Sequence, residues 1–134
     1  MASEQTVRFT LGGMIFEYDE AKNQINIRKH GISFRSAARV FFDYDRIELF
    51  DEENSFEEER FDTIGDTSAG NVGLSGTVIG NIDHSLRKVD DILFVVYTER
   101  KQIEENGRII DVTRLISARM ATNFERGLYY GKYE

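Results

Sequence analysis

Residues 92–100, ILFVVYTER, are typical of a strand at the centre of a β-sheet. The run Leu93–Tyr97 is almost continuously apolar, β-branched or aromatic, as expected of a strand that is covered on both faces. Residues 108–117, RIIDVTRLIS, alternate instead and predict a second strand. Its two faces are expected to carry Ile110, Val112, Arg114 and Ile116 on one side, and Ile109, Asp111, Thr113 and Leu115 on the other.

Shorter strands are expected elsewhere in the chain. Residues 7–18, VRFTLGGMIFEY, predict either a hairpin or a single strand that begins at Met14. Arg46–Phe50 and Arg60–Ile64 also have strand character, and they flank an acidic loop. A glycine-rich excursion is expected at about residues 66–91, with a short strand near Val78–Ile79.

The first of two expected N-terminal helices begins after Asp19, whose carboxylate suits an N-cap. This helix is expected to run to about Lys29. Gly31 follows at the position where left-handed backbone is favoured. One stripe along this helix consists of Ala21, Ile25 and Arg28.

The second N-terminal helix begins after Ser33, another N-cap residue. Its apolar side chains recur at helical spacing and are Phe34, Ala37, Ala38 and Phe41. Thr122 and Glu125 form a capping box that opens a C-terminal helix through Tyr130. Because helices and strands are segregated along the chain, we expect a small α+β domain. Its sheet is expected to be antiparallel, with about four to six strands, two N-terminal helices and one C-terminal helix.

Length and composition limit the class of protein. A chain of 134 residues, 40% hydrophobic and 31% charged, predicts one globular domain over residues 1–134. Without cysteine there is no disulfide, thiol catalysis or thiolate metal site, and the two histidines, His30 and His84, are too few for a three-histidine site. We therefore expect no metal and no cofactor. No apolar run reaches the length of about 18 residues that a membrane helix needs, so a cytoplasmic protein without membrane contact is expected.

The net charge of −7 is distributed unevenly. Residues 43–59 contain nine acidic residues and one basic residue, whereas the rest of the chain contains fifteen acidic and sixteen basic residues. Residues 22–35 and 108–132 are locally basic. The charge therefore does not exclude a nucleic-acid substrate, although the acidic band must avoid such a substrate or bind a basic partner.

Four blocks of the sequence resemble, in order, those of the BrnT toxins. They are FEYDEAKNQINIRKHGISFRSAARVFFD at 16–43, EEERFDTIG at 57–65, ILFVVYTER at 92–100 and RLISARMATNFERGLYY at 114–130. The resemblance implies a RelE-like fold and a ribonuclease of the RelE/ParE kind, which is the toxin half of a type II toxin–antitoxin module. Residues 66–91 and a lengthened turn, KQIEENG, depart from the family pattern.

The resemblance also implies partners. RNA would be the substrate, and its cleavage would inhibit translation and growth. A BrnA-like antitoxin with a ribbon-helix-helix domain would neutralise the toxin, in a complex of two toxins and two antitoxins. DNA would be contacted only through that antitoxin.

Metal-independent cleavage that uses the RNA 2′-hydroxyl as nucleophile needs a base, an acid and cations around the phosphorane. Arginine suits the phosphate because its planar fork binds two oxygens. The catalytic candidates are therefore His30, Arg60, Arg114 and Arg119. His30 is the titratable base within a resembled block. Candidates for RNA contact are Lys29, Tyr97, Arg100, Arg126 and Tyr129.

Some of these residues, and also Glu125, have a structural interpretation. His30 suits the end of a helix, Arg60 and Arg114 suit ion pairs, and Glu125 is most simply the capping-box glutamate. A rival hypothesis for the whole chain is a non-catalytic protein-binding module of the same fold, with the acidic band as its docking surface.

Overall fold

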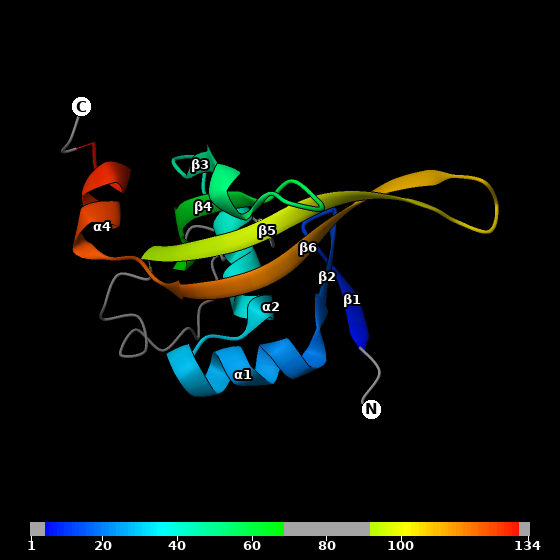
Figure 1. Ribbon diagram of the computed structural model, residues 1–134, viewed down its shortest axis with the longest axis horizontal. Helices are drawn as coiled ribbons and strands as arrows, with labels where there is room; N and C mark the ends of the chain where they lie inside the picture. Colours follow the sequence, from blue (N-terminus) through cyan, green and yellow to red (C-terminus); the bar gives the residue numbers. More distant parts are fainter. Residues whose placement is uncertain (1–4, 69–91, 132–134) are drawn as a thin grey trace.

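The structure is a computed structural model that describes residues 5–68 and 92–131 (Figure 1). Most of the expected excursion at 66–91, including Val78–Ile79 and His84, lies outside the described residues. The strands are β1 (Thr6–Leu11), β2 (Met14–Asp19), β3 (Ile47–Phe50), β4 (Phe61–Asp66), β5 (Ile92–Ile103) and β6 (Ile109–Met120). The helices are α1 (Glu20–His30), α2 (Phe34–Ala37), the 3-10 helices η1 (Ala38–Phe42) and η2 (Glu52–Asn54), and α4 (Asn123–Tyr129).

The described strands form a six-stranded sheet in the order β1-β2-β6-β5-β4-β3. β5 lies between β6 and β4, so the prediction of a central strand at Leu93–Tyr97 is confirmed. The predicted antiparallel sheet is wrong in one respect, because β2 runs parallel to β6 and the sheet is mixed. This pairing joins Phe16 to Thr113 and Glu17 to Arg114. It connects strands from opposite ends of the chain, which local sequence patterns do not encode.

The two faces of the sheet differ in character. The core face carries Phe16, Val95, Tyr97, Leu115 and Ala118, which pack with α2 and η1 into the hydrophobic core. The opposite face, here called the polar face, carries Glu17, Asp62, Arg100, Arg114 and Arg119, as the pairing register requires. Side chains alternate between the faces along each strand.

A β-bulge in β6 decides which side chains share the polar face. Val96 pairs with Ser117 and Tyr97 pairs with Leu115, so Ile116 is an extra residue without a register partner on β5. The expected alternation therefore holds through residues 109–115 and then shifts by one. Arg114 and Arg119 are five residues apart and would face opposite sides of a regular strand. The bulge puts them on the same side.

The helix pair α2 and η1 covers the core face. Phe34, Ala37, Ala38 and Phe41 are all buried, as their spacing predicts. The predicted helix is α-helical only over Phe34–Ala37, however, and continues as the 3-10 helix η1. Gly65 in β4 permits close approach, because a Cβ atom there would lie 3.0 Å from Val40 Cβ. Any side chain at this position would push η1 away from the sheet.

α1 lies below β6 in Figure 1, beside the part of β6 that extends beyond its short pairing with β2. There the Asn26 side chain makes the hydrogen bonds that a neighbouring strand would otherwise make. Its Nδ2 donates to the carbonyl oxygens of Ala118 (2.8 Å) and Ile32 (2.9 Å), and its Oδ1 accepts from the Ala118 amide (3.2 Å). One amide side chain thus satisfies both backbone groups of a strand residue.

The predicted helix ends are confirmed, but the predicted face of α1 is wrong. Asp19 accepts from the Lys22 amide, Gly31 has φ of 72°, and Thr122 with Glu125 forms the capping box. The expected stripe of Ala21, Ile25 and Arg28 is exposed, whereas Asn23 and Asn26 are buried. Apolar periodicity fails here because α1 contacts a strand edge, where hydrogen-bonding groups rather than apolar surface need partners.

We expect Asn26→Ala to lower the free energy of unfolding by on the order of 2–3 kcal/mol, because it leaves buried backbone groups of Ala118 unsatisfied. Urea denaturation measures the change. The control is Ile25→Ala, an exposed position on the same helix, for which a change within about 0.5 kcal/mol is expected. Equal effects of the two substitutions would show that the edge bonds do not hold α1.

Candidate functional site

A buried ion pair lies near the middle of the polar face. Arg114 Nη1 lies 2.8 Å from Glu17 Oε2, and both residues are buried. Arg100 Nη1 reaches the same carboxylate oxygen at 3.4 Å, and Arg8 on β1 lies 3.8 Å from the other oxygen. One carboxylate thus lies within ion-pair distance of three arginines contributed by three different strands.

Electrostatics explain why Glu17 is tolerated in this position. Burial opposes its ionisation, but hydrogen bonds from Arg114 and Gln102 outweigh that cost and hold the pKa of Glu17 below its ordinary value of 4.5. The charges of Arg114 and Arg100 act in the same direction. Glu17 is therefore ionised at neutral pH and keeps Arg114 oriented.

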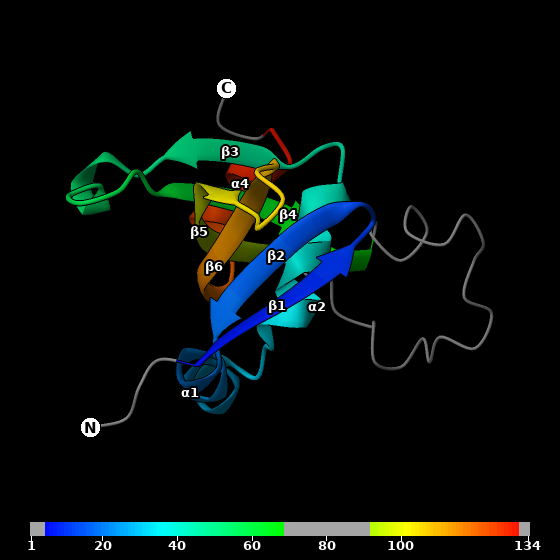
Figure 2. The ribbon, with the colours of Figure 1, turned by 90° about the vertical axis from the view of Figure 1, so that its right-hand side faces the viewer.

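The acidic loop between β3 and β4 folds onto this cluster. Both oxygens of Glu58 accept from Arg100, each at 3.2 Å, and the carbonyl oxygen of Glu59 accepts from the Thr98 hydroxyl at 2.6 Å. Arg60, at the end of the loop, lines a hollow of about 340 Å³ together with Asn54, Phe56, Glu57 and Glu58. Figure 2 shows this loop, with η2, extending well beyond β3 and β4. A carboxylate thus occupies the fork of Arg100, where a phosphate group would bind.

A pair of carboxyl groups lies farther along the same face. Asp62 in β4 is half-buried, and within the described residues no donor reaches its buried Oδ1 atom. Burial, the charge of Asp51 and a hydrogen bond with Asp51 together raise the pKa of Asp62 to about 6. Asp62 therefore titrates close to neutral pH, as a general acid or base requires.

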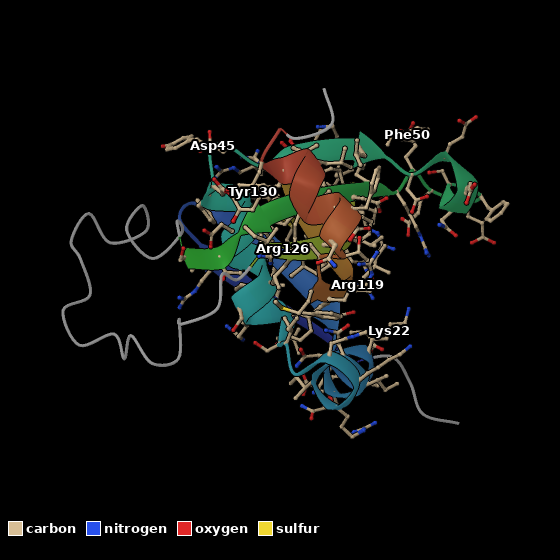
Figure 3. The ribbon with its side chains drawn as sticks, turned by 90° about the vertical axis from the view of Figure 1, so that its left-hand side faces the viewer. Lys22, Asp45, Phe50, Arg119, Arg126 and Tyr130 are labelled. Carbon is tan, nitrogen blue, oxygen red and sulfur yellow. The ribbon has the colours of Figure 1, made fainter. Side chains whose placement is uncertain are left out.

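Arg119 is held rigidly at the β6 end of this face. Its Nη1 and Nη2 atoms donate to the two oxygens of Glu125 at 2.8 and 2.9 Å, and its guanidinium lies 4.2 Å from the centre of the Phe94 ring. The bond to Glu125 raises the pKa of Arg119, whose charge in turn favours ionised Asp62. Figure 3 shows Arg119 and Arg126 on the side of the molecule where α4 lies.

The other predicted site residues are dispersed. Lys29 and His30 are exposed at the end of α1. Tyr97 is buried on the core face, and its hydroxyl donates to Glu48. Tyr129 donates to Asp43 at 2.6 Å, and burial together with that bond raises its pKa. Arg126 is half-buried in α4.

Thus Arg60, Arg100, Arg114 and Arg119 are associated with the polar face, whereas His30, Lys29 and Tyr97 are not. Glu17, Glu58 and Asp62 were not among the functional residues predicted from the sequence. A signal for Asp62 was present, since its strand position places it on the same face as Arg60. Glu17 gave a weaker signal, as an acidic residue between the aromatic residues Phe16 and Tyr18.

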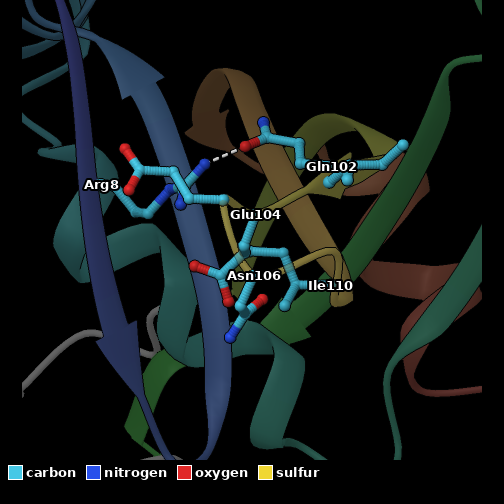
Figure 4. Close-up of a pocket in the computed structure, with 7 residues that line it drawn as sticks. Arg8, Gln102, Glu104, Asn106 and Ile110 are labelled. Atoms are coloured by element: carbon cyan, nitrogen blue, oxygen red, sulfur yellow. Dashed lines mark hydrogen bonds between the residues drawn. The ribbon is translucent and has the colours of Figure 1, made fainter.

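A polar hollow of about 570 Å³ lies between β1 and the tip of the β5–β6 hairpin. Figure 4 shows Arg8 and Gln102 pointing toward each other at its edge, where they form a hydrogen bond. Glu104, Glu105 and Asn106 also line it. Two carboxylates make this hollow unsuited to phosphate, so the polar face is the better candidate site.

In the part of the chain that the structure describes, no group of three acidic, histidine or cysteine side chains is placed to hold a metal ion. No helix among the described residues is long and apolar enough to cross a membrane.

The fold and this face define a small α+β protein whose mixed sheet brings together arginines and ionisable carboxyl groups on the side opposite α2. The chain belongs to the BrnT family. Residues 18–87, or 70 of the 134 residues, match the family described as "ribonuclease toxin, BrnT, of type II toxin-antitoxin system". That family implies an antitoxin partner. No curated protein matches the chain.

We expect Glu17→Gln to lower the free energy of unfolding by about 3–5 kcal/mol at neutral pH, because it leaves Arg114 buried beside a neutral group. Denaturant titration measures this loss. The matched control is Asp111→Asn, which breaks the exposed pair with Lys101 and should leave the free energy of unfolding close to that of the wild type.

The same variant has an expected pH signature. The folded pKa of Glu17 is depressed, so its stabilisation is present above pH 4.5 and is lost as the pH falls through the folded pKa. The difference between wild type and Glu17→Gln should therefore shrink in acid. A difference independent of pH would contradict the role assigned to the Glu17 charge.

Proposed function

We propose that this protein is a metal-independent endoribonuclease that binds RNA across the polar face and cleaves it beside Asp62 and Arg119. The observation that carries the proposal is the position of Asp62. This carboxyl group is half-buried and has a pKa of about 6, and the charge of Arg119 favours its ionised form. Membership of the BrnT family supports RNA as the substrate.

In the proposed reaction, the Asp62 carboxylate takes the proton of the RNA 2′-hydroxyl, whose oxygen attacks the neighbouring phosphorus. The bond to the 5′-oxygen breaks, and a cyclic 2′,3′-phosphate and a 5′-hydroxyl result once the leaving oxygen is protonated. Arg119 stabilises the extra negative charge on the phosphorane. Its fixed geometry supports this role, because the bonds to Glu125 leave little reorganisation to be done.

Arg114 and Arg100 are assigned a different role. Arg114 is buried with Glu17 and therefore positions the neighbouring groups, whereas Arg100 is more than a third exposed and can exchange Glu58 for an RNA phosphate. Arg60 extends the same cationic track along β4. Longer RNA would then be bound by exposed arginines outside the reacting centre.

The proposed inhibitor is a BrnA-like antitoxin with a ribbon-helix-helix domain, in a complex of two toxins and two antitoxins that contacts DNA through the antitoxin. A small reading frame beside the gene should encode it. Cleavage by the free toxin would arrest translation and growth.

One observation favours a second candidate, the non-catalytic binding module. Glu17, Glu58 and Glu125 already provide carboxylates to Arg114, Arg100 and Arg119. If RNA does not displace these groups, the polar face is an internal ion-pair network, and the acidic loop serves protein association.

The test is cleavage of RNA in EDTA by the wild type and by Asp62→Asn. We expect the substitution to reduce the cleavage rate by about 10²-fold or more, since it removes the proton acceptor. The rate of the wild type should rise with pH through about 6. A folded wild type that arrests no growth and cleaves no RNA would favour the binding module.

Two controls separate this role from stability and from His30. The folded pKa of Asp62 is raised from the unfolded value of 3.8 to about 6, so stability is lost as the pH rises from about 3.8 to about 6, and the loss is complete above that range. Asp62→Asn should therefore raise the melting temperature at pH 7 but not below pH 3.8. If the Asp62→Asn variant is inactive but more stable than the wild type, its loss of activity comes from the missing carboxylate and not from unfolding. If His30→Ala abolishes cleavage and Asp62→Asn does not, His30 is the base.

A further inference from the structure

A third hollow lies on the core face, beyond the part that α2 and η1 cover. It has a volume of about 420 Å³ and is lined by Glu48, Leu49, Phe50, Phe61, Tyr97 and Glu99 from β3, β4 and β5. The register places Phe50, Phe61 and Tyr97 in one row across these strands. Asp62 projects from the opposite face, so this groove is separate from the proposed RNA site.

The floor of the groove is aromatic. The Phe50 and Phe61 ring centroids are 5.7 Å apart, those of Phe61 and Tyr97 are 5.6 Å apart, and Tyr97 packs on Phe41 at 4.8 Å. The row thus leads from the core to the surface, where Phe50 is 52% exposed. Figure 3 shows Phe50 near the top of the molecule and Lys22 on α1 near the bottom.

The rim of the groove is acidic. Partial burial raises the pKa of Glu99, and the charges of Asp111 and Glu48 raise it further. Arg46 pairs with Glu48 at 3.5 Å and Lys101 pairs with Asp111 at 2.7 Å. The Tyr97 hydroxyl donates to Glu48, and the Thr113 hydroxyl donates to Glu99 at 3.1 Å. A cation above the groove would relieve the mutual repulsion of Glu48 and Glu99.

The strand beside the groove has an open edge. β3 is the last strand in the sheet order, so within the described residues no strand pairs with its outer side. A segment added along this edge would place alternate side chains above the same face as Glu48 and Phe50. Such a segment would form backbone hydrogen bonds with β3, pack on the aromatic floor of the groove and contact the carboxylates of its rim.

We propose that the antitoxin inserts an extended basic segment along the free edge of β3, with an apolar side chain on Phe50 and a lysine or arginine between Glu48 and Glu99. The inference rests on the antitoxin that the family implies. The antitoxin would bind the toxin at this groove whichever residues cleave RNA.

The test measures binding of the purified antitoxin, the product of the reading frame beside this gene, to toxin variants at low and high salt. We expect Phe50→Ser and Glu99→Lys each to weaken binding by about tenfold or more, and the effect of Glu99→Lys to be smaller at high salt. The controls are Phe56→Ser, which removes a ring that is 88% exposed, and Glu53→Lys, an exposed charge in the acidic loop. Both controls should bind like the wild type.

Two further measurements separate the outcomes. Amides of Ile47–Phe50 should gain protection from hydrogen exchange when the antitoxin binds, which a purely structural effect of the substitutions would not produce. Free Phe50→Ser and Glu99→Lys should retain whatever RNA cleavage the wild type shows, so a failure of the ribonuclease proposal is distinguishable from a failure of this one. The inference is overturned if both variants bind the antitoxin like the wild type, or if binding is lost only on substitution of Arg100 or Arg119.

Discussion

One extra residue in β6 organises the face on which the chemistry is proposed. Ile116 has no register partner on β5, and the strand therefore changes its side-chain alternation between Leu115 and Ser117. Without this bulge, Arg119 would project into the hydrophobic core or force β6 to rotate. With it, Leu115 and Ala118 both contribute to the core, while Arg114 and Arg119 both reach the polar face, about 13 Å apart along the strand.

The arginines on this face are stable in position because carboxylates from other strands and loops neutralise them. Glu17 comes from β2, Glu58 from the acidic loop and Glu125 from α4. A buried guanidinium without such a partner would be costly, whereas an exposed one can exchange its carboxylate for a phosphate at little cost. Arg114 is buried and therefore stays paired with Glu17, whereas Arg100 is more exposed and is available to bind a phosphate. It also gives the acidic loop a physical role as a competitor for the same arginine.

Most local features of the fold could be predicted, because short-range chemistry determines them. Helix caps at Asp19 and Ser33, the left-handed Gly31 and the central strand all depend on neighbouring residues or on burial of a continuous apolar run. The face of α1 could not be predicted from apolar spacing, because its contact is a hydrogen-bonded strand edge served by Asn26. The candidate site was predicted only in part: the arginines stood out as phosphate ligands, but the raised pKa of Asp62 depends on burial and on Asp51.

The sequence by itself determined the identity and ends of most of the described elements, the α+β class and the resemblance to the BrnT family, since these depend on patterns that lie within short stretches of chain. The tertiary structure alone decided the parallel pairing of β2 with β6, the bulge at Ile116 and the contact of the acidic loop with Arg100. Each of these joins residues that are remote in sequence or depends on register between strands. Register is a cooperative property of the whole sheet, because a shift of one residue turns every later side chain to the other face.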